Sequence, residues 1–217
     1  MTTLYHPTVE AVLSRLYAEA RENDRQLEVE RKAAVEAAGH LDEETLASIR
    51  NRTFMAVAPE VGRLFYLLVR TYRPSRLVEF GTSFGLSAIH LAAALRDNGS
   101  GHLITTEQSP EKAARAAQHF EQAGLSDLIE VRRGDAFETL RGVEKIDMLF
   151  LDGWKPLYLP LLRQLEPVLS PRCLVVADDI LSHAAILAPY LDYVRDKANG
   201  YVSCEIPLDD GVELSFR

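Results

Sequence analysis

Cysteine is scarce in this sequence. Only Cys173 and Cys204 occur among the 217 residues, too few and too widely spaced for a disulfide framework or a zinc cluster. Cys173 opens an apolar run that is typical of a protein core. This usage fits a reducing compartment, and we expect the protein to be cytoplasmic.

Long apolar runs and a surplus of basic charge are also missing. No run approaches the roughly 18 apolar residues of a membrane span, and no basic-then-apolar segment opens the chain, so neither membrane insertion nor secretion is expected. The 32 acidic and 24 basic residues give a formal net charge of -8, which argues against a large nucleic-acid-binding surface. A small-molecule partner is the better expectation.

The histidine spacing argues against a zinc site. The six histidines show no H-x-x-x-H pattern.

The sequence does contain a helical N-terminal part. Apolar residues recur at helical spacing between Val9 and Tyr17 and again between Val61 and Val69, and Asp42 is placed to cap a helix between these stretches. The length and the hydrophobic content of 47% fit one globular unit. We expect residues 1–58 to form a helical extension that serves as a lid over the site or as a dimer interface.

Strand-like and helical segments alternate from Arg76 onward. The strand-like runs are continuously apolar, which indicates strands covered on both faces and a mainly parallel sheet with right-handed crossovers. A helix that Pro189 starts or kinks and that Gly200 stops should precede a final hairpin of residues 201–206 and 212–216. The predicted fold class is α/β, doubly wound, with a modified edge. The five core strands are expected at residues 76–80, 103–106, 128–131, 146–151 and 174–177.

A glycine-containing turn after the first core strand is the stretch around which the chain is organised. Residues 79–87 read Glu-Phe-Gly-Thr-Ser-Phe-Gly-Leu-Ser and lead from a strand into a helix N-terminus, which makes a ligand cradle. The turn departs from the dinucleotide fingerprint G-x-G-x-x-G, because Glu79 stands where the first glycine would be. An acidic side chain there repels a pyrophosphate and tolerates a cationic ligand. We therefore expect S-adenosyl-L-methionine, with its ammonium and sulfonium groups, in place of NAD.

Carboxylates stand at the end of every core strand. Ligands of open parallel sheets bind beyond these ends, whereas charges that only face solvent would be scattered over the helices. Glu107 has the spacing of an acid that takes ribose hydroxyls, with a solvated loop carboxylate as the alternative. Asp135 is placed either to accept from an adenine amino group or to make an Asx-turn. The full set is Glu79, Glu107, Asp135, Asp152, Asp178 and Asp179.

Three of these carboxylates indicate a metal site. Asp152, Asp178 and Asp179 offer only hard oxygen ligands, which Mg²⁺ and Ca²⁺ prefer. Crowded together without a cation, they would repel one another and raise their pKa values. The alternative is that Asp179 caps the segment that follows it and leaves two ligands.

Four segments together resemble a known family. They are the glycine turn at 79–87, Asp152-Gly-Trp-Lys-Pro-Leu-Tyr158, Ala177-Asp-Asp-Ile180 and Met55-Ala-Val-Ala-Pro-Glu-Val-Gly62. In combination they resemble the catechol and caffeoyl-CoA O-methyltransferases, the metal-dependent members of the class I S-adenosylmethionine-dependent methyltransferases, over roughly residues 50 to 217. The resemblance implies a Rossmann-like sheet of seven strands in the order 3-2-1-4-5-7-6, the last strand antiparallel, with residues 59–217 as the methyltransferase domain.

The resemblance also implies roles for individual residues. Glu79, Gly81 and Ser87 would hold the methionine end of the cofactor, Glu107 its ribose and Asp135 its adenine. Met55 and Val57 would shield the cofactor, while Asp152 and Trp154 would line its pocket. The metal ligands would be Asp152, Asp178 and Asp179, which hold Mg²⁺, with Mn²⁺ or Ca²⁺ as alternatives.

The implied reaction is methyl transfer to a hydroxyl of a small, catechol-like vicinal diol. The cation and Asp152 would position and acidify the hydroxyl, and Lys155 would take its proton, provided that burial and the cation lower the pKa of Lys155. The alternative is that Lys155 only pairs with a carboxylate. A homodimer and a hydroxylated aromatic acceptor are expected.

The sequence departs from the family pattern in places. Asp179 stands where the family usually has Asn, which adds a negative charge, and Gly153 replaces bulkier residues of the animal catechol enzymes, which should open the wall near the cofactor. The acid that grips the second hydroxyl falls near Cys204, Glu205 and Asp209.

Three rival functions stay open at this level. They are methylation of a hydroxylated tRNA nucleoside, cofactor binding without turnover, and an NAD-dependent dehydrogenase.

Overall fold

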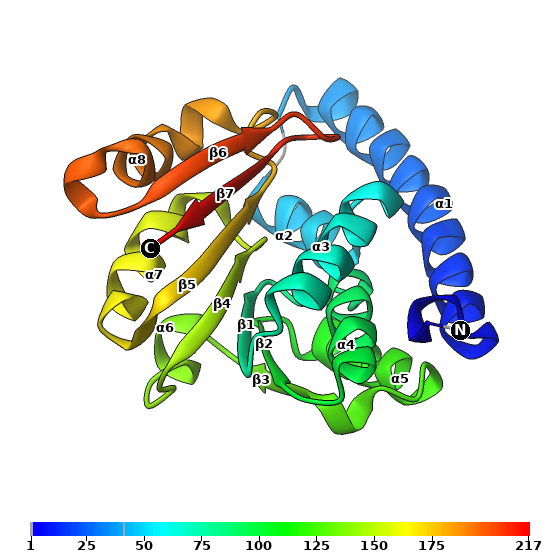
Figure 1. Ribbon diagram of the computed structural model, residues 1–217. Coiled ribbons are helices and arrows are strands. Elements are labelled where there is room, and N and C mark those ends of the chain that lie inside the picture. Colours follow the sequence, from blue (N-terminus) through cyan, green and yellow to red (C-terminus); the bar gives the residue numbers. More distant parts are fainter. Residues whose placement is uncertain (1, 41) are drawn as a thin grey trace.

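The computed structural model describes residues 2–40 and 42–217, and a seven-stranded sheet lies at its centre (Figure 1). The strand order is β3-β2-β1-β4-β5-β7-β6, in which β7 runs antiparallel to both of its neighbours and the remaining pairs are parallel. This confirms the fold class and the strand order implied by the resemblance. The strands are β1 (Arg76–Phe80), β2 (His102–Glu107), β3 (Ile129–Arg133), β4 (Ile146–Leu151), β5 (Leu169–Asp178), β6 (Val202–Ile206) and β7 (Val212–Phe216).

Helices cover both faces of the sheet (Figure 1). On one face pack α1 (Pro7–Ala38), α3 (Pro59–Tyr72), α4 (Leu86–Asn98) and α5 (Pro110–Gln122), and on the other α6 (Ala136–Thr139), α7 (Tyr158–Leu165) and α8 (Ala184–Arg195). Successive side chains of β4 enter opposite cores: Met148 and Phe150 join the first, and Leu149 and Leu151 the second. A strand buried on both faces needs apolar residues at every position, which explains the continuous apolar runs of the sequence.

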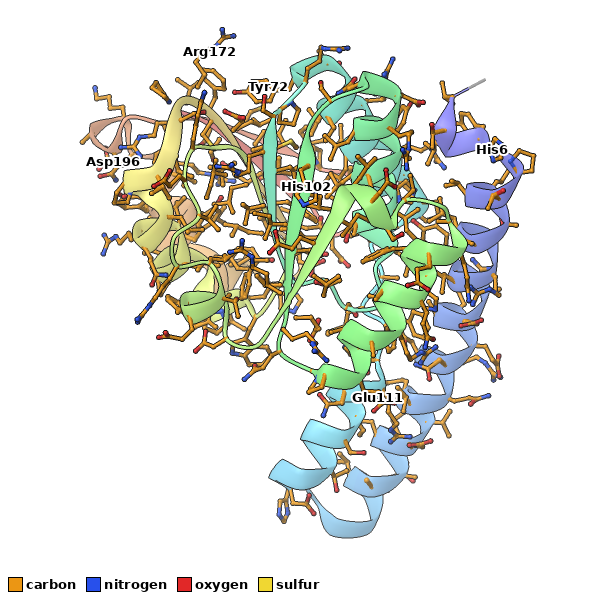
Figure 2. The ribbon with its side chains drawn as sticks, turned by 90° about the horizontal axis from the view of Figure 1, so that it is seen from below. His6, Tyr72, His102, Glu111, Arg172 and Asp196 are labelled. Atoms are coloured by element: carbon orange, nitrogen blue, oxygen red, sulfur yellow. The ribbon has the colours of Figure 1, made fainter. Side chains whose placement is uncertain are left out.

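The N-terminal helices belong partly to this core. Leu4, Val9 and Leu16 are buried in the same cluster as α4, and the hydroxyl of Thr3 donates to Asp97 at 2.6 Å. Farther along, the end of α1 and α2 (Glu43–Arg52) project from the body of the molecule (Figure 2). The expected cap is present, because Asp42 Oδ1 accepts from the Thr45 amide at 2.7 Å.

Two elements differ from expectation by more than two residues. Pro189 lies inside α8, which begins at Ala184, so of the two predicted roles this proline does not start the helix. The fifth core strand begins at Leu169 instead of Leu174, because its first residues form an irregular stretch against β4 that contains Pro171. No helix within the described ranges is both long enough and apolar enough to cross a membrane.

Candidate functional site

The glycine turn packs directly against the loop after β4. β1 and β4 are parallel neighbours in which Phe80 pairs with Leu151, so the turns that follow them start side by side. Gly81 has φ +105°, and a Cβ atom there would lie 2.5 Å from the carbonyl oxygen of Asp152. Only glycine permits both the backbone angle and the close approach.

Glu79 ends up inside the protein. Its side chain is fully buried, and Oε2 accepts a hydrogen bond from the Thr105 hydroxyl. Oε1 has no hydrogen-bond partner among the described residues. Burial, helped by the carboxylates of Asp152 and Glu107, raises the pKa of Glu79 to about 7. A buried carboxyl with one unpartnered oxygen is suited to a cationic ligand group.

Glu107 holds the loops on both sides of the cradle. Its Oε2 accepts from the Ser83 amide at 2.8 Å and its Oε1 from the Ser109 amide at 2.9 Å. Two acceptor positions of the carboxylate are thereby used, and two remain. Ser109 also caps α5, since its side chain accepts from the Lys112 amide.

The segment between α2 and α3 lies over this cradle. Phe54 stacks on Phe84 with ring centroids 4.1 Å apart, Lys112 Nζ donates to the carbonyl oxygen of Thr53 at 2.9 Å, and Ser83 Oγ donates to that of Phe54 at 2.7 Å. Sequence reasoning missed these ties, which join residues far apart in the chain.

The predicted cofactor residues near this segment have different environments. Val57 and Ser87 are buried, whereas Met55 is 60% exposed and has φ +46°. An exposed apolar side chain beside the cradle is available to cover a ligand.

Asp135 makes a hydrogen bond within its own turn, which is the second of the two roles expected for it. Its Oδ1 accepts from the Phe137 amide at 2.9 Å, and it is the N-cap of α6. The side chain is exposed, so one acceptor oxygen still faces outward.

Lys155 lies among the strand-end carboxylates. Its Nζ is 2.6 Å from Asp179 Oδ2 and 3.4 Å from Asp152 Oδ1. It also lies 3.0 Å from the hydroxyl of Tyr158, which donates to the carbonyl oxygen of Asp178 at 3.3 Å. The structure therefore brings together the four residues predicted to carry metal and proton chemistry, with Lys155 paired to two of the carboxylates.

Electrostatics in this cluster reflect burial. Burial raises the pKa of Asp152 to about 7 and that of Asp178 to about 9. Burial disfavours the charge on Lys155, but the carboxylates of Asp152 and Asp179 outweigh it and raise the Lys155 pKa. These carboxylates act against the expected fall in the Lys155 pKa, which depended on a bound cation as well as on burial.

The donor chemistry of the cluster suits a hard cation, although the present arrangement does not enclose one. In residues 2–40 and 42–217, no three His, Cys, Asp or Glu side chains are arranged to hold a metal ion. Asp179 does not cap α8 with its side chain, as the alternative required, because that side chain contacts Lys155.

Gly153 does not open the wall of the site. A Cβ atom at this position would lie 2.5 Å from the Phe80 ring, so the Phe80 side chain fills the space that a bulkier residue would take. The expectation of a wider pocket is wrong here. The next residue, Trp154, is 56% exposed at the site's rim.

Of the three candidates for a second hydroxyl contact, Asp209 lies near enough to Asp179 to feel its charge. The turn that contains it is tied to the segment after β5, because the amide of Leu181 donates to the carbonyl oxygen of Asp210 at 2.8 Å. Burial and the carboxylates of Asp210, Glu60 and Asp179 raise the pKa of Asp209. Glu205 instead pairs with Arg195 at 2.9 Å.

Comparison with known proteins agrees with this geometry. A family described as "Methyltransferase domain" matches residues 78–180. A catechol O-methyltransferase of Sus scrofa is 34% identical over 149 residues, which cover 65% of this chain and 78% of that protein. One of Niastella koreensis is 33% identical over 138 residues, which cover 61% of this chain and 62% of that protein.

A solved structure shares the fold. The O-methyltransferase TomG from Streptomyces achromogenes, solved in complex with SAM, superposes with a TM-score of 0.67 at 27% identity, over 75% of this chain and 81% of that one. The chain thus spans less than two thirds of the Niastella relative and most of the Streptomyces one.

Proposed function

The chain belongs to the catechol and caffeoyl-CoA O-methyltransferase family, and from this premise we propose that it transfers a methyl group from S-adenosylmethionine to a hydroxyl of a small vicinal diol. The observation that carries the proposal is the position of Lys155, with its Nζ 2.6 Å from Asp179 and 3.4 Å from Asp152 at the end of β4. Methyl transfer from a sulfonium to an oxygen is an in-line displacement that needs proximity and a deprotonated nucleophile. The cradle supports the requirement for proximity, and the carboxylate cluster around Lys155 supports the requirement for a deprotonated nucleophile.

Glu79 and Glu107 are the residues that would bind the cofactor. The unpartnered Oε1 of the buried Glu79 would accept from the ammonium group of the methionine end. The two acceptor positions left on Glu107 would take the ribose hydroxyls. Gly81 and Ser87 line the same turn, Asp135 is available for the adenine, Met55 and Val57 cover the site, and Trp154 forms its rim.

A divalent cation, Mg²⁺ or alternatively Mn²⁺ or Ca²⁺, would be held by Asp152, Asp178 and Asp179. It would supply Lewis-acid chemistry, which lowers the pKa of a bound hydroxyl. Their oxygen donors fit such an ion, and the raised pKa values of Asp152 and Asp178 reflect buried carboxylates that lack sufficient positive charge.

Lys155 would be the general base. With its pKa raised by the neighbouring carboxylates, it is protonated at neutral pH in the chain alone. It can accept a proton only where the negative charge around it is neutralised. Tyr158, in hydrogen-bond contact with Lys155 at 3.0 Å, would hold its ammonium head in place.

The helical extension supports a proposed homodimer, and the cysteines support a proposed cytoplasmic location. Val29 and Val35 expose apolar side chains on the second half of α1, and this supports a homodimer that uses residues 1–58. Cys173 and Cys204 are both free thiols, which fits the reducing cytoplasm.

The experiment that tests the proposal compares cofactors and acceptors. Thermal unfolding should shift upward with S-adenosylmethionine and its demethylated product but not with NAD. Mass spectrometry should then detect a methylated product with catechol, and none with phenol, which lacks the second hydroxyl. Stabilisation by NAD alone would contradict the proposal, as would a methylated nucleoside from a tRNA hydrolysate with unmodified catechol.

A further inference from the structure

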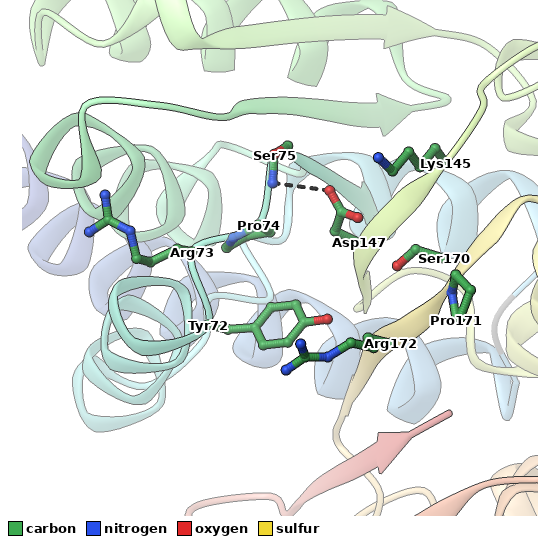
Figure 3. A pocket seen from close by; sticks show the side chains of 9 residues that line it. All are labelled: Tyr72, Arg73, Pro74, Ser75, Lys145, Asp147, Ser170, Pro171 and Arg172. Atoms are coloured by element: carbon green, nitrogen blue, oxygen red, sulfur yellow. Dashed lines mark hydrogen bonds between the residues drawn. The ribbon is translucent and has the colours of Figure 1, made fainter.

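A cavity lies at the N-terminal ends of the parallel strands, on the side of the sheet opposite to the candidate active site. It is a cleft of about 400 Å³, formed where β1, β4 and β5 begin (Figure 3). Because these strands are parallel, their first residues gather at one edge and their strand-end carboxylates at the other. The cleft therefore has no wall in common with the methyl-transfer site. Its lining residues are Tyr72, Arg73, Pro74, Ser75, Lys145, Asp147, Ser170, Pro171 and Arg172.

An irregularity in β5 forms one wall. Between the pairs Ile146–Leu169 and Met148–Leu174, β4 advances two residues while β5 advances five. The additional residues of β5 leave the ladder and include Ser170, Pro171 and Arg172. Such bulges recur beside binding sites, where they redirect side chains.

Two cationic side chains at the cleft have no ion-pair or hydrogen-bond partner among the described residues. Neither Lys145 nor Arg172 makes an ion pair or a hydrogen bond with another described residue. In Figure 3 the ammonium of Lys145 points toward Asp147, and the guanidinium of Arg172 lies beside the Tyr72 ring. Two free cations in a chain of net charge -8 mark a local anion-attracting surface.

The other charged groups at the cleft are engaged. Arg73 donates to the carbonyl oxygen of Asn98 at 2.8 Å, away from the cleft. Asp147 Oδ2 accepts from the backbone amides of Ser75 and Arg76, both at 3.0 Å. The carboxylate is thereby held against the backbone, and its charge is partly offset by two donors.

Ser170 adds an independent indication of a ligand. Its side chain is 8% exposed, and its Oγ has no hydrogen-bond partner within the described chain. In Figure 3 this oxygen faces the open space between Asp147, Tyr72 and Arg172. Buried hydroxyls without partners are rare in native proteins and need an explanation.

We propose that the cleft binds the phosphate group of a small phosphomonoester. Lys145, Arg172 and the hydroxyls of Ser170 and Tyr72 supply donors from several sides, which suits a tetrahedral phosphate better than a planar carboxylate, and a guanidinium can bind phosphate through two parallel bonds. The Tyr72 ring, Pro74 and Pro171 offer apolar surface to the organic part. The volume of the cleft fits a small molecule.

The test is a calorimetric titration of the full chain with phenyl phosphate. Binding should be saturable, and the double variant Lys145→Ala/Arg172→Ala should weaken it by about tenfold or more, as expected for two lost charge-assisted contacts. Ser170→Ala should weaken binding by a smaller factor without lowering the thermal midpoint, because it removes a hydroxyl that lacks a partner. The matched control is Arg21→Ala/Lys197→Ala, which removes the same charge from exposed positions outside the cleft and should bind like the unmodified chain.

Three results would overturn the proposal. They are no saturable binding, an equal loss in the control and cleft variants, and binding of benzoate as tight as that of phenyl phosphate. The second result would mean that net charge alone attracts the anion, and the third that the site does not select phosphate.

Discussion

Replacement of Glu107 by alanine tests the cofactor cradle at one residue. The carboxylate accepts the amides of Ser83 and Ser109, and its two remaining acceptor positions are the ones proposed for the ribose hydroxyls. A lost charge-assisted hydrogen bond costs about 1.5 to 3 kcal/mol, so the affinity for S-adenosylmethionine should fall by about 10- to 150-fold. Titration calorimetry measures this directly.

The structural role of Glu107 requires controls. The alanine variant leaves two partly buried amides without their acceptors, which costs stability of the order of 1 kcal/mol for each amide, so thermal unfolding is measured beside the affinity. Glu107→Gln keeps one carbonyl oxygen, and its affinity for S-adenosylmethionine should lie between those of the unmodified chain and the alanine variant. Glu111→Ala removes the same charge from the exposed first turn of α5 and should bind normally. An alanine variant that is folded and binds with unchanged affinity would refute the role of Glu107.

Three further predictions concern buried charge, the base and assembly. Burial raises the folded pKa of Glu79 to about 7 against about 4.3 in the unfolded chain. The contribution of Glu79 to stability is therefore complete below about pH 4, and about 3 kcal/mol of it is lost as the pH rises toward 7. Chemical unfolding of Glu79→Gln at each pH should lack this loss, and identical pH profiles for the two proteins would disprove the assignment. Lys155→Ala should keep its affinity for the cofactor but methylate catechol more slowly, and the loss of rate should be smaller at high pH, where the diol ionises unaided. A loss of rate that stays constant with pH would rule out a role as base. Lys197→Ala serves as the surface control. Light scattering should find a dimer of the 24.3 kDa chain, and a single monomeric species at micromolar concentration would count against the proposed use of residues 1–58.

Much of the fold could be predicted because its signals are local. Apolar runs such as Ile146–Leu151 mark strands buried on both faces, and Asp42 and Ser109 cap the helices that follow them. The sheet order came from the resemblance, since strand pairing across the chain leaves no local signal. The start of β5 was missed because Pro171 and Arg172 do not look like strand residues, and the irregular register there is set by the neighbouring β4.

The site was predictable as a set of residues and less so as an arrangement. Strand-end position grouped Asp152, Asp178 and Asp179, and the resemblance added Lys155. The structure brings Lys155 into contact with two of these carboxylates. The sequence alone does not decide the direction of the Lys155 pKa shift, because burial and nearby charge act in opposite senses and the distances decide between them. The Phe80 ring against Gly153, and the ties from Lys112 and Ser83 to residues 53 and 54, are long-range contacts without a sequence signature.

The dependence of catechol methylation on a divalent cation tests the central claim most directly. If Asp152, Asp178 and Asp179 form an oxygen site beside Lys155, methylation should vanish in chelator and return with Mg²⁺ or Mn²⁺, while calorimetry still finds cofactor binding. Asp178→Ala should lose metal binding and turnover together, whereas Asp179→Asn should remain active, because its amide oxygen can still ligate. Full activity of the unmodified chain in chelator, together with an unaffected Asp178→Ala variant, would contradict the account.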